Sequence, residues 1–146
     1  MTQIEKVLFF QEVELFSSLS LEQLGQLARI VREIDASKGE MLFREKGLSE
    51  SAYVIVEGNV ALEANGERIL ISGEKELVGT WALLDDEPMA VTATVIEDSR
   101  LLRIDREDFY DLLADHSEMM QNIFHILILR IRKLIESAGP GGEPGN

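Results

Sequence analysis

Few side chains in this sequence of 146 residues are of the types that perform nucleophilic or metal chemistry. There is no cysteine, which excludes disulfides, thiolate metal sites and cysteine nucleophiles. The two histidines, His116 and His125, are nine residues apart and have no nearby second ligand in the sequence. We also find no nucleophile elbow, no P-loop and no paired-carboxylate signature. The sequence therefore does not indicate an enzyme, and we expect no catalytic residue, no metal and no cofactor.

The charged residues are strongly unbalanced, with 27 acidic against 14 basic and a formal net charge of -13. Phosphate contacts need Lys and Arg gathered on one face, so this excess argues against a general nucleic-acid binder. The one dense basic cluster is Arg130, Arg132 and Lys133. Near a helix C-terminus these cations complement the helix dipole, while contact with nucleic acid or lipid head groups is the alternative.

No apolar run approaches the roughly 20 residues that a membrane span needs. Residues 1–11 contain one Lys and only a short apolar patch, which is not the pattern of a signal peptide. We therefore expect a cytoplasmic protein without a membrane span.

Residues 1–31 are expected to be helical. Ser20 can cap a helix that begins after it, and Gln23 occupies the reciprocal position of a capping box. Apolar residues then repeat at helical spacing: Leu21, Leu24, Leu27, Ala28 and Val31. This helix should pack one face on a core.

Residues 32–104 contain short strand-like runs divided by turn signals. The runs are 34–37, 41–44, 52–56, 60–64, 68–72, 90–96 and 100–104. Asn65-Gly66 lies between two of them and is a strong hairpin signal, because both residues tolerate positive φ. A break from Trp81 to Pro88 separates the last two runs from the others. Short strands at close spacing predict a mainly β, antiparallel sandwich or barrel.

Residues 105–136 predict two closing helices. Asp105 is expected to cap the first of them and Ser117 the longer second one. In the second helix five apolar residues step by four and three, like a short coiled-coil seam: Met120, Phe124, Leu127, Ile131 and Leu134. One side of this helix can cover the barrel, which leaves another side for a partner. The Gly- and Pro-rich segment 137–146 predicts a flexible tail.

The segment from Val78 to Thr92 reads VGTWALLDDEPMAVT. It resembles the phosphate-binding cassette of the cyclic-nucleotide-binding domain family, which reads aromatic-Gly-Glu-Leu-Ala-Leu-Leu and then Pro-Arg-Ser/Thr-Ala-Thr-Val. An upstream set resembles the family's Gly-acid-Tyr-x-Ile-x-x-Gly hairpin: Gly47, Glu50, Tyr53, Ile55, Gly58 and Val60. The resemblance covers about residues 6–136, nearly everything but the tail.

This resemblance implies a jelly-roll-like β-barrel (a double-stranded β-helix) of about eight strands, with N-terminal helices and two C-terminal helices. The single domain would span residues 1–136, with helices in 1–31, the barrel in 32–104 and the closing helices in 105–136. The ligand pocket would be formed by Gly79, Thr80, Trp81, Ala82, Met89, Ala90 and Thr92. Packing of a strand–helix junction is the alternative role for these residues. For Trp81 we favour a place in the core over stacking on a planar ligand.

The sequence departs from the family pattern at the two positions that hold the nucleotide. Thr80 stands where the family has the Glu that takes the ribose hydroxyl. Met89 stands where it has the Arg that pairs with the cyclic phosphate. Removing such a buried charge-assisted pair typically costs about 2–5 kcal/mol. We therefore expect weak or no binding of cyclic AMP and cyclic GMP, and another small molecule is the alternative ligand.

The resemblance to catabolite-activator-like sensors also implies a function. Ligand at the cassette would move the C-terminal helices, which then act on a homodimer partner or on a partner domain. We thus expect a regulatory module; a ligand-free structural or dimerisation module is the alternative. Only ten residues follow Glu136, so we do not expect direct DNA binding by this chain. A stand-alone domain and a piece of a larger receptor are both compatible with the sequence.

Overall fold

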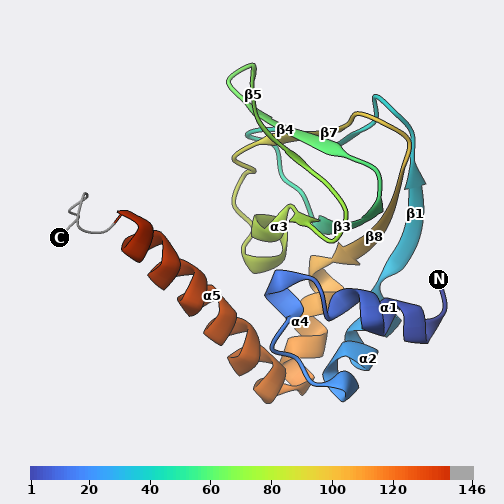
Figure 1. Ribbon diagram of the computed structural model, residues 1–146, viewed down its shortest axis with the longest axis vertical. Coiled ribbons are helices and arrows are strands. Elements are labelled where there is room, and N and C mark those ends of the chain that lie inside the picture. Colours follow the sequence, from blue (N-terminus) through green and yellow to red (C-terminus); the bar gives the residue numbers. More distant parts are fainter. Residues whose placement is uncertain (139–146) are drawn as a thin grey trace.

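The computed structural model describes residues 1–138, and helical segments come first (Figure 1). They are α1 (Gln3–Phe10), the 3-10 turn η1 (Glu14–Phe16) and α2 (Leu21–Ile30). The Ser20 hydroxyl accepts a hydrogen bond from the Gln23 backbone at 3.1 Å, and the Gln23 side chain accepts one from the Ser20 backbone at 2.9 Å. The predicted capping box is confirmed.

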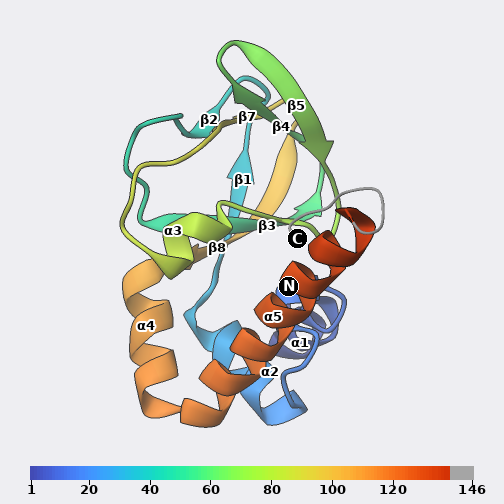
Figure 2. The ribbon, with the colours of Figure 1, turned by 90° about the vertical axis from the view of Figure 1, so that its left-hand side faces the viewer.

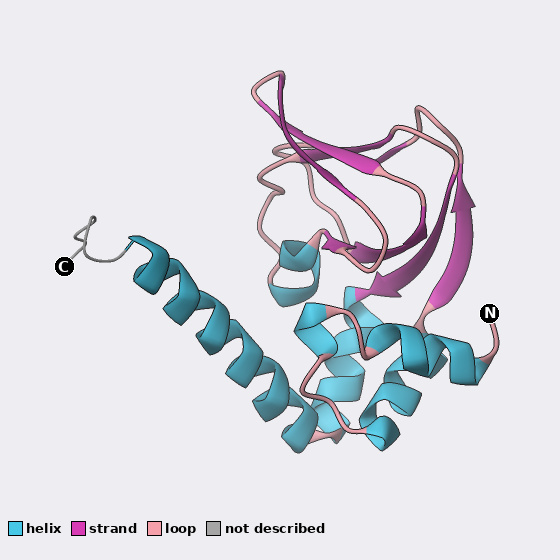
Figure 3. Ribbon diagram, in the orientation of Figure 1, coloured by secondary structure: helices cyan, strands magenta, loops and turns pink. Residues whose placement is uncertain are grey.

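The strands of the described residues form two antiparallel sheets of four strands each (Figure 3). Their bounds are β1 (Arg32–Ala36), β2 (Met41–Phe43), β3 (Ser51–Glu57), β4 (Val60–Ala64), β5 (Glu67–Ser72), β6 (Leu77–Val78), β7 (Thr92–Val95) and β8 (Ser99–Asp105). A short helix, α3 (Thr80–Leu84), lies between β6 and β7. Every predicted run contains a strand, and the β4–β5 hairpin turns at Asn65 and Gly66 with φ of 55° and 79°.

The strands of residues 1–138 do not form a closed barrel. The strand orders are β1-β8-β3-β6 and β2-β7-β4-β5, and within residues 1–138 no strand of one sheet pairs with a strand of the other. Strand β6 has only two residues, which pair with Tyr53 and Val54 of β3. It is too short to extend the hydrogen-bond ladder from β3 to a strand of the second sheet. A mainly antiparallel β fold with flanking helices is confirmed, whereas the jelly-roll description stays a prediction.

Strand β3 divides the core into two parts. Its residues Ala52 and Val54 face the helices, while Tyr53 and Ile55 face the second sheet. The helix-side cluster includes three fully buried phenylalanines: Phe10, Phe16 and Phe109. The cluster between the sheets includes Phe43, Val60, Met89, Val95 and Leu101. The alternation of side chains along one strand thus sets which face meets helices and which meets the other sheet.

Two helices close the described chain, α4 (Arg106–Asp115) and α5 (Ser117–Ala138). Asp105 is the residue before α4, but its side chain makes no cap bond there. The carboxylate instead accepts hydrogen bonds from the Arg103 Nε at 2.8 Å and the Ser51 hydroxyl at 2.6 Å. The prediction of a side-chain cap at Asp105 is therefore wrong, because two neighbours on the sheet bind that carboxylate.

Helix α5 packs on the body through its first half, where Met119 and Ile123 are buried and Ile126 and Leu127 are partly buried, and Arg130 then binds Glu14 of η1. Beyond that it runs away from the group formed by α1, α2 and α4 (Figures 1 and 2). It ends at Ala138, two residues beyond the predicted end at Glu136. The remaining residues of the predicted flexible tail, 139–146, lie outside the described residues. Among residues 1–138 no helix has both the length and the apolar character to cross a membrane.

Candidate functional site

A pocket of about 550 Å³ lies between α3 and α5, and we call it the α3–α5 pocket. Its walls come from β4, β6, α3, the segment before β7 and the second half of α5. Of the predicted ligand-binding residues, those that line it are Gly79, Thr80, Trp81, Met89 and Ala90. The sequence therefore located most of one wall of this pocket.

Gly79 fixes the position of the first turn of α3. It has a left-handed backbone with φ of +84°, a conformation that only glycine adopts without cost. A Cβ at this position would lie 2.9 Å from the Phe43 ring and 3.4 Å from the Ala52 Cα. Both the turn and the close packing on β3 thus require glycine here.

Arg106 holds the other end of α3. From the first position of α4, its Nη1 donates to the backbone carbonyls of Ser49 at 3.3 Å, Ala82 at 3.3 Å and Asp85 at 2.8 Å. The guanidinium thereby ties the end of α3 to the loop before β3. Sequence reasoning missed this contact because the three carbonyls are backbone groups, which carry no residue-type signal.

Met89 occupies the predicted position of the phosphate-pairing cation. Its side chain is 4% exposed and belongs to the apolar cluster between the two sheets. Its backbone is held on both sides, since the Met89 amide donates to the Gly47 carbonyl at 2.8 Å and the Lys46 amide donates to the Met89 carbonyl at 2.7 Å. The residue is thus a fixed part of the core and presents no charge to the pocket.

Three other predicted residues lie differently from expectation. Trp81 is 56% exposed, so the favoured prediction of a core position is wrong. Ala82 is buried against the core and does not line the pocket. Thr92 is also absent from the pocket walls, and its hydroxyl already accepts a hydrogen bond from the Glu45 amide at 2.8 Å. Five of the seven predicted residues thus line this pocket, and Ala82 and Thr92 do not.

The opposite wall comes from α5, whose seam residues were predicted to form a dimer interface. Leu127, Ile131 and Leu134 of the predicted seam line the pocket. Among the described residues that line it, Arg130 is the only cation, and its Nε and Nη2 bind the Glu14 carboxylate at 3.0 Å and 2.6 Å. The one positive charge at this pocket is therefore already paired.

The chemistry of the α3–α5 pocket is that of binding. Apart from Thr80 and the paired Arg130, its walls are glycine and apolar side chains, among them Leu62, Leu77 and Val91. Neither polar residue is part of a nucleophile–base pair. The geometry supports a ligand pocket of ordinary small-molecule size.

Comparison with known proteins assigns the fold to a family. The family described as "Cyclic nucleotide-binding domain" matches residues 33–116, which include most of both sheets, α3 and α4. This chain belongs to that family. The match contains the segment from Val78 to Thr92 on which the resemblance rests, so the predicted family is confirmed.

Individual relatives agree with this assignment. The Cyclic AMP receptor protein of Thermus thermophilus is 27% identical over 124 residues, covering 82% of this chain and 57% of that protein. The CRP-like cAMP-activated global transcriptional regulator of Mycobacterium tuberculosis is 22% identical, covering 82% and 55%. This chain thus spans little more than half the length of these two relatives. A solved N-terminal domain of a transcriptional regulator from Streptomyces coelicolor A3(2) is 26% identical with a TM-score of 0.79, covering 88% of this chain and 95% of that one.

The packing around Gly79 predicts the effect of adding one methyl group. Gly79→Ala should lower the free energy of unfolding more than Gly66→Ala. Both residues have positive φ near +80°, which costs Ala about 1–2 kcal/mol, but only Gly79 lacks space for a Cβ. The clash with Phe43 should add about 1–3 kcal/mol. Urea denaturation of both variants measures the difference, and equal losses would show that Phe43 moves freely aside.

Proposed function

We propose that this domain is a regulatory module, not an enzyme, that relays the state of the α3–α5 pocket through α5. The observation that supports this most directly is that a single helix, α5, both lines the pocket and extends beyond the body of the domain. Leu127, Ile131 and Leu134 form a wall of the pocket, while the same helix extends beyond the body of the domain. A molecule bound between α3 and α5 would contact α5 directly and would bias its position.

The same proposal includes weak or no binding of cyclic AMP and cyclic GMP. A cyclic phosphate in the α3–α5 pocket would lie among apolar side chains, with Met89 in place of a cation. The charge of Arg130 is already offset by Glu14, which its Nε and Nη2 bind. Thr80 can offer a hydroxyl but no charge. The chain has a formal net charge of -13, and among the described residues no further cation lines this pocket.

Calorimetric titration of the full chain tests the binding proposal. We expect no saturable heat and no thermal shift with cyclic AMP or cyclic GMP up to millimolar concentration. The physical reason is the loss of about 2–5 kcal/mol with the missing charged pair, or a factor of roughly 30 or more in affinity. Micromolar binding would contradict the proposal and would show that backbone amides and Thr80 suffice.

Restoring the family residues tests whether charge alone is missing. The double variant Thr80→Glu with Met89→Arg should gain measurable affinity for cyclic AMP, at least roughly 30-fold above the parent. The matched control Thr80→Gln with Met89→Leu keeps comparable sizes without charge and should bind as weakly as the parent. Thermal unfolding confirms that both variants fold. A folded charged variant without affinity would mean that packing, and not missing charge, closes the site.

A second candidate function, dimerisation through α5, is favoured by the exposure of its apolar seam. Phe124, Ile131 and Leu134 are 57%, 56% and 65% exposed. The other two predicted seam residues, Met120 and Leu127, are partly buried against the body. A helix that leaves this much apolar surface uncovered is typical of one that packs on a partner, and a second copy would supply the same seam in return.

Sedimentation velocity of the full chain tests dimerisation. The parent should sediment as a dimer and the variant Ile131→Asp with Leu134→Asp as a monomer, because a charge at each position must be desolvated to pack. His125→Asp introduces a charge at another exposed position of α5 and should leave the dimer intact. A parent that is monomeric at tens of micromolar, or a dimer unaffected by the double change, would contradict this candidate function.

A further inference from the structure

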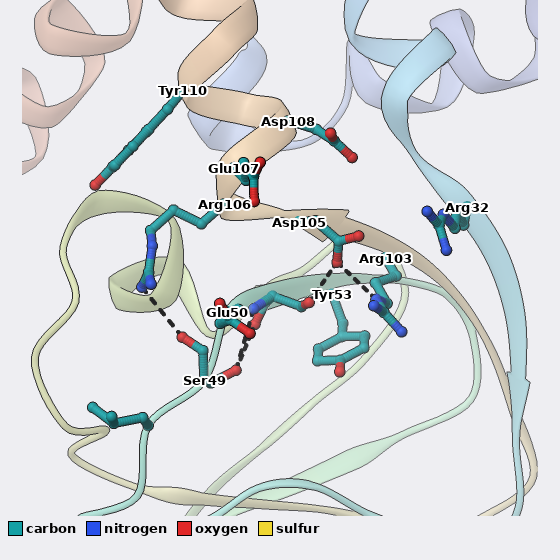
Figure 4. Close-up of a pocket in the computed structure, with 12 residues that line it drawn as sticks. Arg32, Ser49, Glu50, Tyr53, Arg103, Asp105, Arg106, Glu107, Asp108 and Tyr110 are labelled. Carbon is teal, nitrogen blue, oxygen red and sulfur yellow. Dashed lines mark hydrogen bonds and ion pairs between the residues drawn. The ribbon is translucent and has the colours of Figure 1, made fainter.

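A second hollow, of about 810 Å³, lies at one end of the space between the sheets, where β1, β8 and β3 meet the start of α4 (Figure 4). It shares no lining residue with the α3–α5 pocket. Its character is also different, because charged and hydroxyl side chains form most of its wall. The function proposed above does not use this hollow, and the inference that follows does not depend on that function.

Three hydrogen-bond donors form a row across the floor of the hollow. Arg32 of β1 is the register partner of Arg103 of β8, and Arg103 is in turn the partner of Tyr53 of β3. Register partners on adjacent strands project from the same face, and the strands lie about 4.7–4.9 Å apart. Two like charges directly opposite each other destabilise a sheet unless an anion lies between or above them.

Arg103 is held in one orientation by its neighbours. Its Nε donates to the Asp105 carboxylate at 2.8 Å, and the same oxygen accepts the Ser51 hydroxyl at 2.6 Å. Burial raises the pKa of the Asp105 carboxyl, but these two hydrogen bonds together with the positive charges of Arg103 and Arg32 outweigh it and hold the pKa below its ordinary value. The carboxylate is therefore charged at neutral pH and fixes one edge of the guanidinium. Within residues 1–138 the terminal nitrogens of Arg103 make no hydrogen bond.

The Tyr53 hydroxyl is a further donor without a partner. Tyr53 is only 9% exposed and lines the hollow beside Arg103, yet its hydroxyl makes no hydrogen bond to any of residues 1–138. Burial raises the pKa of this hydroxyl above its ordinary value, so it carries its proton at neutral pH. The hydroxyl itself is accessible from the hollow, and without a partner among the described residues it can donate to a molecule bound there.

We propose that this hollow binds a small polar molecule through an oxyanion, a carboxylate or a phosphate, that bridges Arg32, Arg103 and Tyr53. A guanidinium with free terminal nitrogens matches the geometry of either oxyanion. Asp105 already offsets part of the repulsion between the two arginines, and the bound anion would offset more of it. Glu50 and Glu107 lie on the opposite side of the hollow from Arg32 (Figure 4). That acidic side accepts N–H or O–H donors from the rest of the molecule and disfavours a second anionic group there.

Titration of the isotope-labelled full chain with inorganic phosphate and with succinate, followed by NMR at constant ionic strength, tests this proposal. The Arg103 Nε–H signal, assigned by its loss in Arg103→Lys, should shift in a saturable way with at least one probe. Arg32→Gln and Tyr53→Phe should each weaken binding about tenfold, because each removes one hydrogen bond to a charged group. Tyr53→Phe removes only the hydroxyl and keeps the packing of the ring.

The matched control is Arg68→Gln, which removes the same charge from an exposed position on β5 in the other sheet. It should bind the probes as the parent does. Saturation with phosphate alone would indicate a phosphoryl ligand, and saturation with succinate alone a carboxylate. The proposal is overturned if neither probe saturates. It is equally overturned if Arg32→Gln, Tyr53→Phe and Arg68→Gln weaken binding to the same extent, because only net charge would then matter.

Discussion

The constraint on which the rest of the structure depends is that the central strands β3 and β8 have apolar side chains on both faces. The face toward the helices carries Ala52, Val54, Leu102 and Ile104. The face toward the second sheet carries Tyr53, Ile55 and Leu101. A sheet of this kind must be covered twice, and the two covers differ. The N-terminal helices with α4 bury one face, and the second sheet buries the other. Each fully buried Leu, Ile or Phe in these layers stabilises the fold by about 1.5–3 kcal/mol.

Patterns of period and turn chemistry made much of this fold predictable. Alternating apolar residues located every strand except β6, and Asn65-Gly66 and Ser20 with Gln23 marked a turn and a helix start that the structure contains. Strand β6 was missed because two residues carry no periodicity; only pairing with β3 makes them a strand. That the two sheets of residues 1–138 do not pair with each other was not predictable for a related reason. Alternation predicts which side chains share a face, but not whether the last strand of one sheet meets the first of the other.

The candidate site was predictable in its position but not in all its residues. The segment from Val78 to Thr92 identified one wall, while the α5 wall came from residues that the heptad-like spacing assigned to a partner. Trp81 shows the limit most clearly: a lone Trp is usually core, yet the short α3 leaves it 56% exposed at the pocket edge. Thr92 shows another limit. Its hydroxyl accepts a hydrogen bond from the Glu45 backbone amide, and such a contact with a backbone group cannot be predicted from residue types.

Two consecutive residues, Asp105 and Arg106, support the polar hollow and the α3–α5 pocket, respectively. Asp105 ends β8 and orients Arg103 in the polar hollow, whereas Arg106 begins α4 and binds the Ala82 and Asp85 carbonyls at the end of α3. The backbone turns here from a strand, whose alternation aims Asp105 between the sheets, into a helix, whose first turn aims Arg106 at α3. Because the Asp105 carboxylate turns toward Arg103 and Ser51 and makes no cap bond to α4, it fixes the central member of the row of donors beside Tyr53. The contacts of Asp105 and Arg106 at this strand–helix junction therefore link the charged hollow to α3, which forms part of the apolar pocket wall.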